Sequence, residues 1–315
     1  MSLFLGIDTS NYTTSLALWN SETATVHQEK KLLPVKDGAM GLRQSDAVFH
    51  HTCQLPQLME KLCNNDALSP VAVGVSVSPT EQEGSYMPCF LAGEGLARSL
   101  SAVWQVPLWR VTHQQGHVAA ACLGADCVSL LDEPFLAFHV SGGTTDALFV
   151  TPTEDGGISC KLVAHSLDLK AGQLVDRVGG RLGLAFPAGP ALDKLAATST
   201  ASFRCRPSMD GDNCHLSGVE NQCEQHLKNG MLPADVARFC LDSIEAALVA
   251  MTERLLEKYG TLPLVFAGGV MSNSILRENL KARYGAYFAP PVFSADNAAG
   301  VALLAARKNE RKGEV

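Results

Sequence analysis

Two histidines, His113 and His117, stand four residues apart in VTHQQGHVAA, directly after the strand-like VPLWRV. Residues four apart share one face of a helix, so both imidazoles could reach one metal ion. Gln114 stands where a zinc protease of the H-E-x-x-H type has its general-base Glu, so the segment does not predict a metalloprotease. The spacing also fits two histidines hydrogen-bonded at a domain interface, and by itself it leaves both interpretations open.

A metal site needs more ligands than one pair of imidazoles. The sequence offers His139, in the strand-like FLAFHVSGG, and Asp296, in FSADNAAG at the start of the last expected helix. Imidazole and carboxylate groups both bind transition metals. Taken singly, each residue is also explained as a structural one.

Three glycine-rich turns, VSGGTTD, GLAFPAGPALD and FAGGVMSN, adjoin apolar segments in the second half. Glycine lets backbone N–H groups approach a phosphate or a nucleobase without a Cβ in the way. None of the three is a Walker A loop or a G-x-G-x-x-G, and each alone also fits an ordinary tight turn. Three such turns in one half favour nucleotide binding.

Acidic residues close to these turns have two interpretations each. Asp176, in GQLVDRVGG, could bond a ribose hydroxyl or pair with Arg177 or Arg181 on its helix. Asp193, in AGPALDKLA, is explained as a first-turn acid that the helix dipole favours. The turn GIDTSN places Asp8 near the chain start, as a phosphate or Mg²⁺ contact or as a turn former.

The elements that position these residues repeat along the chain. FLGIDTS, TTSLALWN and ATVHQEKK predict three strands, and PFLAFHVSGG, TTDALFVTP and ISCKLVAHSLD predict three more, with helices after each set. We expect Pro56 to mark a break or a first turn of its helix, and Ser272 to cap the helix after FAGGV. The pattern predicts a duplicated α/β architecture, with subdomains at 1–128 and 129–315 and a ligand cleft between them.

Composition sets limits on the function. The chain has 315 residues, 46% hydrophobic and 18% charged, and its net charge is −7, so an RNA partner would need a local basic patch or a helper subunit. No apolar run reaches the roughly 18 residues of a membrane span, which predicts a cytoplasmic protein without membrane contact. The ten cysteines are scattered without C-x-x-C, which predicts reduced, mostly buried thiols.

The ordered segments GIDTSNYTTSLAL, HQQGH, HVSGGTTDAL, DLKAGQLVDRVGGRLGLAFPAGP, LSG, FAGGVMSNSILR and SADNAAGVA together resemble one family. It is the TsaD type of tRNA N6-threonylcarbamoyladenosine transferases, formerly labelled O-sialoglycoprotein endopeptidases. The resemblance runs nearly from end to end. It implies the duplicated actin/Hsp70/sugar-kinase core, which is ribonuclease H-like, with a nucleotide cleft.

The resemblance also implies roles for individual residues. His113, His117 and Asp296 fall on the ligands of one divalent metal, iron or zinc with Mg²⁺ as a further candidate, and His139 is an additional ligand. The positions that fall on contacts to an adenine nucleotide, threonylcarbamoyl-AMP or ATP, are Ser141, Gly142, Gly143, Asp176, Gly189, Asp193 and Asn273. From the turn patterns described above we add Thr144, Gly268, Gly269, Asp8 and Ser10 as nucleotide-binding candidates.

The chain departs from the family pattern near the reaction centre. It has SGGTT for SGGHT, with Thr144 in place of His, and DLKAGQLVDR for DDAAGEAFDK, which changes Leu169 and Gln173. Glu220 replaces the lysine of FSGLKT, and SPTEQEGSYMPCFLAG replaces a glycine-rich turn. These changes indicate a divergent paralogue with a rebuilt acceptor side.

The expected activity is metal-dependent transfer of threonylcarbamoyl from its adenylate to N6 of adenosine 37 in tRNA, without a side-chain nucleophile. One alternative is a carbamoyltransferase with a non-tRNA acceptor. Another is a non-catalytic, nucleotide-binding scaffold for a true transferase. The resemblance further implies helper subunits, a hetero-oligomer with a metal-free paralogue, or a homodimer.

Overall fold

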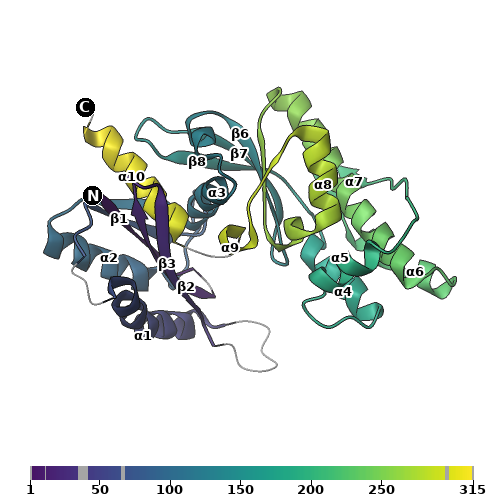
Figure 1. Cartoon of the computed structure of the whole chain (residues 1–315), viewed down its shortest axis with the longest axis horizontal. Helices are drawn as coiled ribbons and strands as arrows, with labels where there is room; N and C mark the ends of the chain where they lie inside the picture. The colour runs from purple at the N-terminus through teal and green to yellow at the C-terminus, as the bar shows by residue number, and fades with distance from the viewer. Residues whose placement is uncertain (1, 11, 35–41, 65–67, 295–297, 314–315) are drawn as a thin grey trace. The chain divides into compact units, whose positions relative to one another are not determined.

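The computed structural model describes residues 2–10, 12–34, 42–64, 68–294 and 298–313 (Figure 1). The chain divides into two compact units. Unit 1 comprises Met1–Glu133, Thr151–Cys160 and Val292–Val315, and unit 2 comprises Pro134–Val150 and Lys161–Pro291. Each unit is described by itself below.

Unit 1 is built on a five-stranded sheet of order β3-β2-β1-β4-β5. Its strands are β1 (Leu3–Asp8), β2 (Thr13–Asn20), β3 (Thr25–Leu32), β4 (Ala72–Ser78) and β5 (Leu108–Thr112). The first three form an antiparallel meander, and β4 and β5 continue the sheet in parallel with β1. β1 and β2 are almost wholly buried, which explains why their sequences are nearly continuous apolar runs.

Four long helices complete unit 1: α1 (Gln44–Cys63), α2 (Phe90–Trp104), α3 (His113–Gly124) and α10 (Ala299–Gly313). α1 and α2 pack on β2 and β4, and α10 lies against β1, β4 and α3 (Figure 1). The approach of α10 to the sheet needs glycine at residue 6, because a Cβ there would lie 2.4 Å from the Ala298 carbonyl oxygen. The C-terminal helix, which belongs to the second half of the sequence, is therefore part of the core of unit 1.

The sheet of unit 2 has the order β12-β11-β6-β7-β8, which repeats the topology of unit 1. Its strands are β6 (Phe135–Val140), β7 (Thr145–Pro152), β8 (Ile158–His165), β11 (Leu264–Ala267) and β12 (Tyr287–Phe288). Again a three-strand meander comes first, and β11 and β12 extend it in parallel. The expected duplicated α/β architecture is confirmed.

Helices with an apolar face cover the sheet of unit 2, and the 27-residue helix α7 supplies much of the core. The remaining elements of unit 2 are α4 (Ala171–Arg181), α5 (Gly189–Ala196), β9 (Ser208–Asp210), β10 (Asn213–His215), α6 (Ser217–Lys228), α7 (Pro233–Tyr259), the 3₁₀ turn η2 (Gly269–Ser272) and α8 (Ser274–Tyr284). The 3₁₀ turn η1 (Val128–Asp132) belongs to unit 1, and α9 (Pro291–Ser294) lies at the boundary that leads back to it.

Two local expectations were wrong. Pro56 does not break its helix, because α1 runs through it from Gln44 to Cys63. Asn273 and not Ser272 caps α8: its side chain accepts the Leu276 N–H at 3.0 Å, while Ser272 closes the preceding 3₁₀ turn. Asn and Ser are comparable N-caps, so the choice between neighbours depends on backbone geometry that the sequence does not show.

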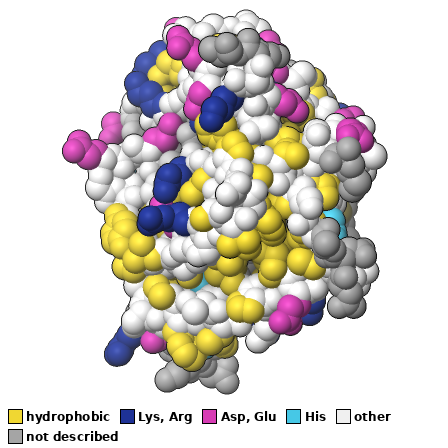
Figure 2. All heavy atoms as spheres, turned by 90° about the vertical axis from the view of Figure 1, so that its left-hand side faces the viewer, with side chains coloured by type: hydrophobic (Ala, Val, Ile, Leu, Met, Phe, Trp, Pro, Cys, Tyr) yellow, Lys and Arg dark blue, Asp and Glu magenta, His cyan; other side chains and the backbone are white. Residues whose placement is uncertain are grey.

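The cysteines are reduced and mostly buried, as the sequence predicts. All ten cysteines are free, and Cys53 alone is exposed. Hydrophobic side chains gather on one face of the molecule (Figure 2), and a groove of about 650 Å³ between α1 and α2 is lined mainly by their apolar residues, among them Leu55, Met59 and Leu96. None of the described helices has the length and apolar character that a membrane crossing requires.

Candidate functional site

The turn between β6 and β7 is an ordered backbone loop at the edge of unit 2. The Ser141 hydroxyl oxygen accepts the N–H groups of Gly143 and Thr144, both at 3.2 Å, and lies 2.9 Å from the Thr144 hydroxyl. The Ser141 carbonyl accepts the Gly172 N–H from the first turn of α4. The loop is thereby fixed beside a helix N-terminus, an arrangement that suits an anion.

Glycines in this region fall into two classes. A Cβ added at Gly142, Gly143, Gly189 or Gly269 would meet no protein atom within 4 Å, so packing does not require glycine there. At Gly172, by contrast, a Cβ would lie 2.5 Å from the Gly142 nitrogen. The first class leaves space in front of the backbone, which is the property a bound phosphate or base needs.

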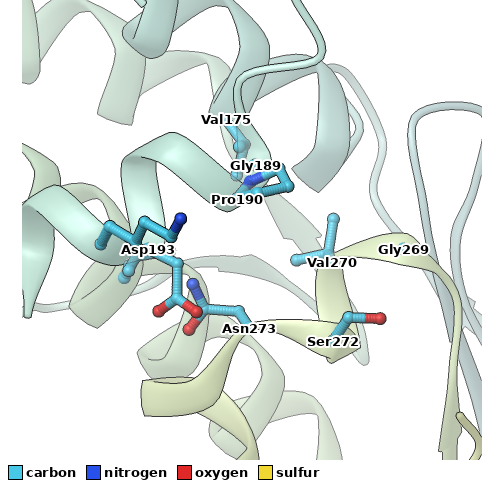
Figure 3. Close-up of a pocket in the computed structure, with 10 residues that line it drawn as sticks. Val175, Gly189, Pro190, Asp193, Gly269, Val270, Ser272 and Asn273 are labelled. Atoms are coloured by element: carbon cyan, nitrogen blue, oxygen red, sulfur yellow. The ribbon is translucent and has the colours of Figure 1, made fainter. Parts of the chain in front are cut away.

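A pocket of about 220 Å³ lies within unit 2 between α5, α7 and the turn before α8 (Figure 3). Its lining includes Gly189 and Asp193 from α5, and Gly269 and Asn273 from the turn after β11. Two of the three glycine-rich turns thus meet in one cavity. The pocket gathers polar groups among apolar ones such as Val270, as small-ligand sites do.

Asp193 and Asn273 lie beside one another at the start of α8 (Figure 3). The Asp193 carboxylate accepts both the backbone N–H of Ser274 at 3.0 Å and its hydroxyl at 2.9 Å. The Asn273 side-chain oxygen accepts the Leu276 N–H, and its amide donor bonds none of the described residues. Both side chains order this end of the pocket, and the Asn273 amide can still donate to a ligand.

Asp176 holds the turn that leads into α5. Its Oδ1 accepts the Ala188 N–H at 2.8 Å, one residue before Gly189 of the pocket. Of the two interpretations of Asp176, the ion pair with Arg177 or Arg181 is wrong, because both arginines instead donate to Glu220, at 3.0 and 2.9 Å. Asp176 is therefore a positioning residue for the pocket wall.

The histidine pair lies in unit 1, on the first turns of α3. Thr112 and Gln115 form a capping box that starts the helix directly at His113. The two imidazole rings are 4.3 Å apart between centroids. The sequence prediction that both lie on one helix face is confirmed by this contact.

His113 is oriented by a buried carboxylate at the end of β1. Its Nδ1 lies 3.0 Å from Asp8 Oδ2, and since a carboxylate only accepts, Nδ1 carries the proton. Asp8 also accepts the hydroxyl protons of Ser10 and Ser76. In the neutral ring this bond would place the lone pair of His113 on Nε2, the arrangement that metal-binding histidines show.

The other two expected metal ligands cannot be compared with the histidine pair within one unit. Asp296 lies outside the described residues, and His139 belongs to unit 2, where it faces Asp146 across the strand pair β6–β7. Within the described ranges, no three His, Cys, Asp or Glu side chains form a group that could hold a metal ion. The His113–His117 pair fits two ligands, and the complete set stays a prediction.

Sequence reasoning missed two groups near Asp8. Ser76 donates to its carboxylate from β4, and fully buried His51 of α1 bonds Thr14, which donates in turn to Gln54. Burial lowers the pKa of His51 to about 4, against the raising effect of Asp8. The alternation of hydroxyl residues in VGVSVS was the one available signal for Ser76.

Comparison with solved structures identifies the fold. A full-length HypF in its phosphate- and nucleotide-bound form matches with a TM-score of 0.62 at 14% identity, over 100% of this chain and 47% of that one. HypF of T. kodakarensis matches with 0.59 at 12% identity, over 99% and 48%. The chain therefore spans about half the length of these proteins.

A second structural relative has a similar size. Component A of the (R)-2-hydroxyglutaryl-CoA dehydratase of Acidaminococcus fermentans matches with a TM-score of 0.53 at 14% identity, over 99% of this chain and 100% of that one. At these identities the likeness concerns the fold. The sequence model of one family, described as TsaD: tRNA N6-adenosine threonylcarbamoyltransferase, matches residues 35–303. The chain belongs to this transferase family.

Proposed function

We propose that the protein transfers a threonylcarbamoyl group from threonylcarbamoyl-AMP to N6 of adenosine 37 in tRNA, in the cytoplasm and with a divalent metal bound. The observation that carries the proposal is a pair of features in unit 2. One is the β6–β7 turn, which we call the phosphate turn, in which Gly142 and Gly143 have free space in front of the backbone. The other is the pocket formed by two further glycine-rich turns. Both occur in a chain of the transferase family.

In this proposal the adenylate binds through unit 2. The backbone N–H groups around Gly142 and Gly143 approach the phosphate, with Thr144 beside them. The nucleoside enters the pocket, where Gly189 and Gly269 leave room and Asn273 donates from its amide. Asp193 lines the pocket, and Asp176 fixes the turn that leads to Gly189. Gly268 precedes the pocket residue Gly269 with a φ of +102°, which favours glycine in that turn. No side-chain nucleophile is needed.

The reaction itself is an acyl transfer. The acceptor amine attacks the carbamoyl carbon, a C–N bond forms, the C–O bond to AMP breaks, and the amine loses a proton. His113, His117, Asp296 and His139 would hold an iron or zinc ion. Such an ion would supply positive charge that stabilises the leaving phosphate and makes the carbonyl more electrophilic. Asp8 and Ser10 keep His113 in the tautomer that presents Nε2.

A different acceptor is the second candidate. Glu220, which stands in place of the family lysine, forms ion pairs with Arg177 and Arg181, so the α4–α6 surface carries a network of paired charges where the family pattern has a lysine. That observation favours a small molecule or a protein as the substrate amine. The non-catalytic scaffold alternative predicts that removing His113 and His117 changes nothing.

The test is transfer of labelled threonylcarbamoyl from its adenylate to unmodified tRNA, with helper proteins from the same source. We expect label on the tRNA with the native protein and a loss of at least about 100-fold in His113→Ala/His117→Ala. The matched control is His27→Ala/His50→Ala, which removes two histidines elsewhere in unit 1.

Each other outcome selects an alternative. Adenylate consumed without label on tRNA indicates a different acceptor. If the adenylate is bound but never consumed, the non-catalytic scaffold is the remaining interpretation. Such a scaffold would associate with a metal-free paralogue or with a second copy of this chain. Equal activity of the histidine variant and the control would refute the metal assignment.

A further inference from the structure

The segment between α5 and β9 has an unusual pattern of exposure. From residue 201 to 207 it alternates strictly between partly buried and exposed positions, although these residues belong to no strand, and the alternation continues into β9 at Ser208. Alternation with period two is the signature of an extended chain on a surface. The outward positions are Ser202, Arg204, Arg206 and Ser208, which we call the arginine edge.

The inward side of this segment is fastened to α7. The Phe203 N–H donates to Asp242 Oδ2 at 3.2 Å, and the Phe203 ring packs edge-on against Phe239 at 5.5 Å between centroids. Two residues further on, the Ser243 hydroxyl donates to Cys205 Sγ at 3.3 Å. The segment is thus held in register, and its outward side chains are presented from a fixed backbone.

The two arginines of the arginine edge have no direct ion pair, although the next exposed position of the same alternation is Asp210. Within the described residues neither Arg204 nor Arg206 contacts a carboxylate, whereas Arg177, Arg181 and Arg238 in the same unit each have at least one ion pair. The carboxylate beneath the segment, Asp242, is itself neutralised by Arg238 at 2.7 Å. In a chain of net charge −7, two free guanidinium groups side by side form a local basic site.

We infer that the arginine edge binds the phosphodiester backbone of an RNA. This inference rests on the proposed function and assigns a part of the acceptor's contact surface. At about 3.3 Å per residue, Arg204 and Arg206 are about 6.6 Å apart along an extended chain, so each can contact a different phosphate of one strand. The flanking serine hydroxyls can donate to phosphate oxygens, and nothing on this edge reads a base.

The experiment measures binding of unmodified tRNA to the full chain by fluorescence anisotropy, over a series of salt concentrations. We expect Arg204→Ala/Arg206→Ala to raise Kd roughly tenfold or more. The slope of log K against log salt should fall by about 1.4 for a single strand or about 1.8 for a duplex, because two phosphate contacts disappear. The matched control is Arg98→Ala/Arg254→Ala, which removes the same charge from exposed positions on α2 and α7.

Binding of AMP is measured in parallel, so that the two hypotheses fail separately. If Arg204→Ala/Arg206→Ala binds tRNA more weakly but binds AMP as the native protein does, the inference is supported. An edge variant that binds tRNA like the native protein, or like the control, overturns it. A native protein that binds AMP but no tRNA also overturns it while leaving a transferase with another acceptor, and loss of both refutes the proposed function as well.

Discussion

At the scale of single residues, His51 shows how burial fixes a protonation state. Its pKa of about 4 in the fold lies below the ordinary 6.5, so folding favours the neutral ring. The associated stability is complete above pH 6.5 and is lost as the pH falls toward 4. Between pH 7.5 and 4.5 the loss should be about 2.5 kcal/mol.

The measurement is urea unfolding of the native protein and of His51→Gln at both pH values. Trp19, Trp104 and Trp109 all lie in unit 1, so tryptophan fluorescence reports this unit alone. Gln keeps a hydrogen-bonding group near Thr14 and does not titrate, so other groups contribute equally to both proteins. Parallel pH dependence in the two proteins would contradict the assignment.

At the scale of elements, α4 packs closely against the β6–β7 turn at Gly172, where a side chain has no room. Gly172→Ala places a methyl group 2.5 Å from the Gly142 nitrogen, which should cost about 1–3 kcal/mol by overpacking. Gly143→Ala meets nothing in the protein and should leave the melting temperature unchanged. It should nevertheless weaken AMP binding, because the methyl group fills the space in front of the phosphate turn.

Calorimetric melting and titration with AMP distinguish the two effects. The control is Gly180→Ala in the exposed part of α4, which should stabilise by up to about 1 kcal/mol through helix propensity. If Gly143→Ala binds AMP as the native protein does, the phosphate is not held at this turn. If Gly172→Ala melts normally, the contact between α4 and the turn is not tight.

The strands were the part of the fold that sequence predicted best. All six meander strands appear within about three residues of their expected ends, because buried strands are marked by apolar runs and their turns by Gly, Asn and Ser. The short hairpin of β9 and β10 was missed, since three-residue strands carry no periodicity. Pro56 was misjudged because the sequence does not show whether a helix continues on both sides of a proline.

The sequence shows which residue types could form the site, but it does not show which of them contact one another in the fold. The glycine turns and the His113–His117 pair have recognisable spacings. The bond of Asp8 to His113, by contrast, joins residues 105 positions apart, and only the folded sheet brings them together. The internal use of Asp176 and Asp193 as positioning groups was likewise not predictable from sequence, because their carboxylates accept hydrogen bonds from backbone N–H groups of distant turns.

At the scale of the whole molecule, the C-terminal helix α10 completes the hydrophobic core of unit 1. Residues 299–306 of α10 are all buried, and Gly300 packs so closely on Gly116 of α3 that a Cβ would lie 1.9 Å from its carbonyl oxygen. A chain ending at residue 294 should therefore lose the cooperative fluorescence transition of unit 1. Hydrogen exchange should still show protection of α7 in unit 2.

A chain ending at residue 309 is the control, since it keeps the bonds of Arg307 to Asp132 and of Lys308 to Asp155. It should unfold much like the full chain. Cooperative unfolding of unit 1 in the shorter chain, or loss of protection throughout unit 2, would show that α10 does not have this role.

The placement of α10 also has a consequence for biosynthesis. The ribosome releases the strands of the first sheet early, yet that sheet stays partly uncovered until residues 299–306 have left the exit tunnel. Nearly all of unit 2, from residue 134 to 291, emerges before then and can fold without waiting. The half that is translated second is thus the first able to finish folding, and the nascent first half is the one that most needs protection by chaperones.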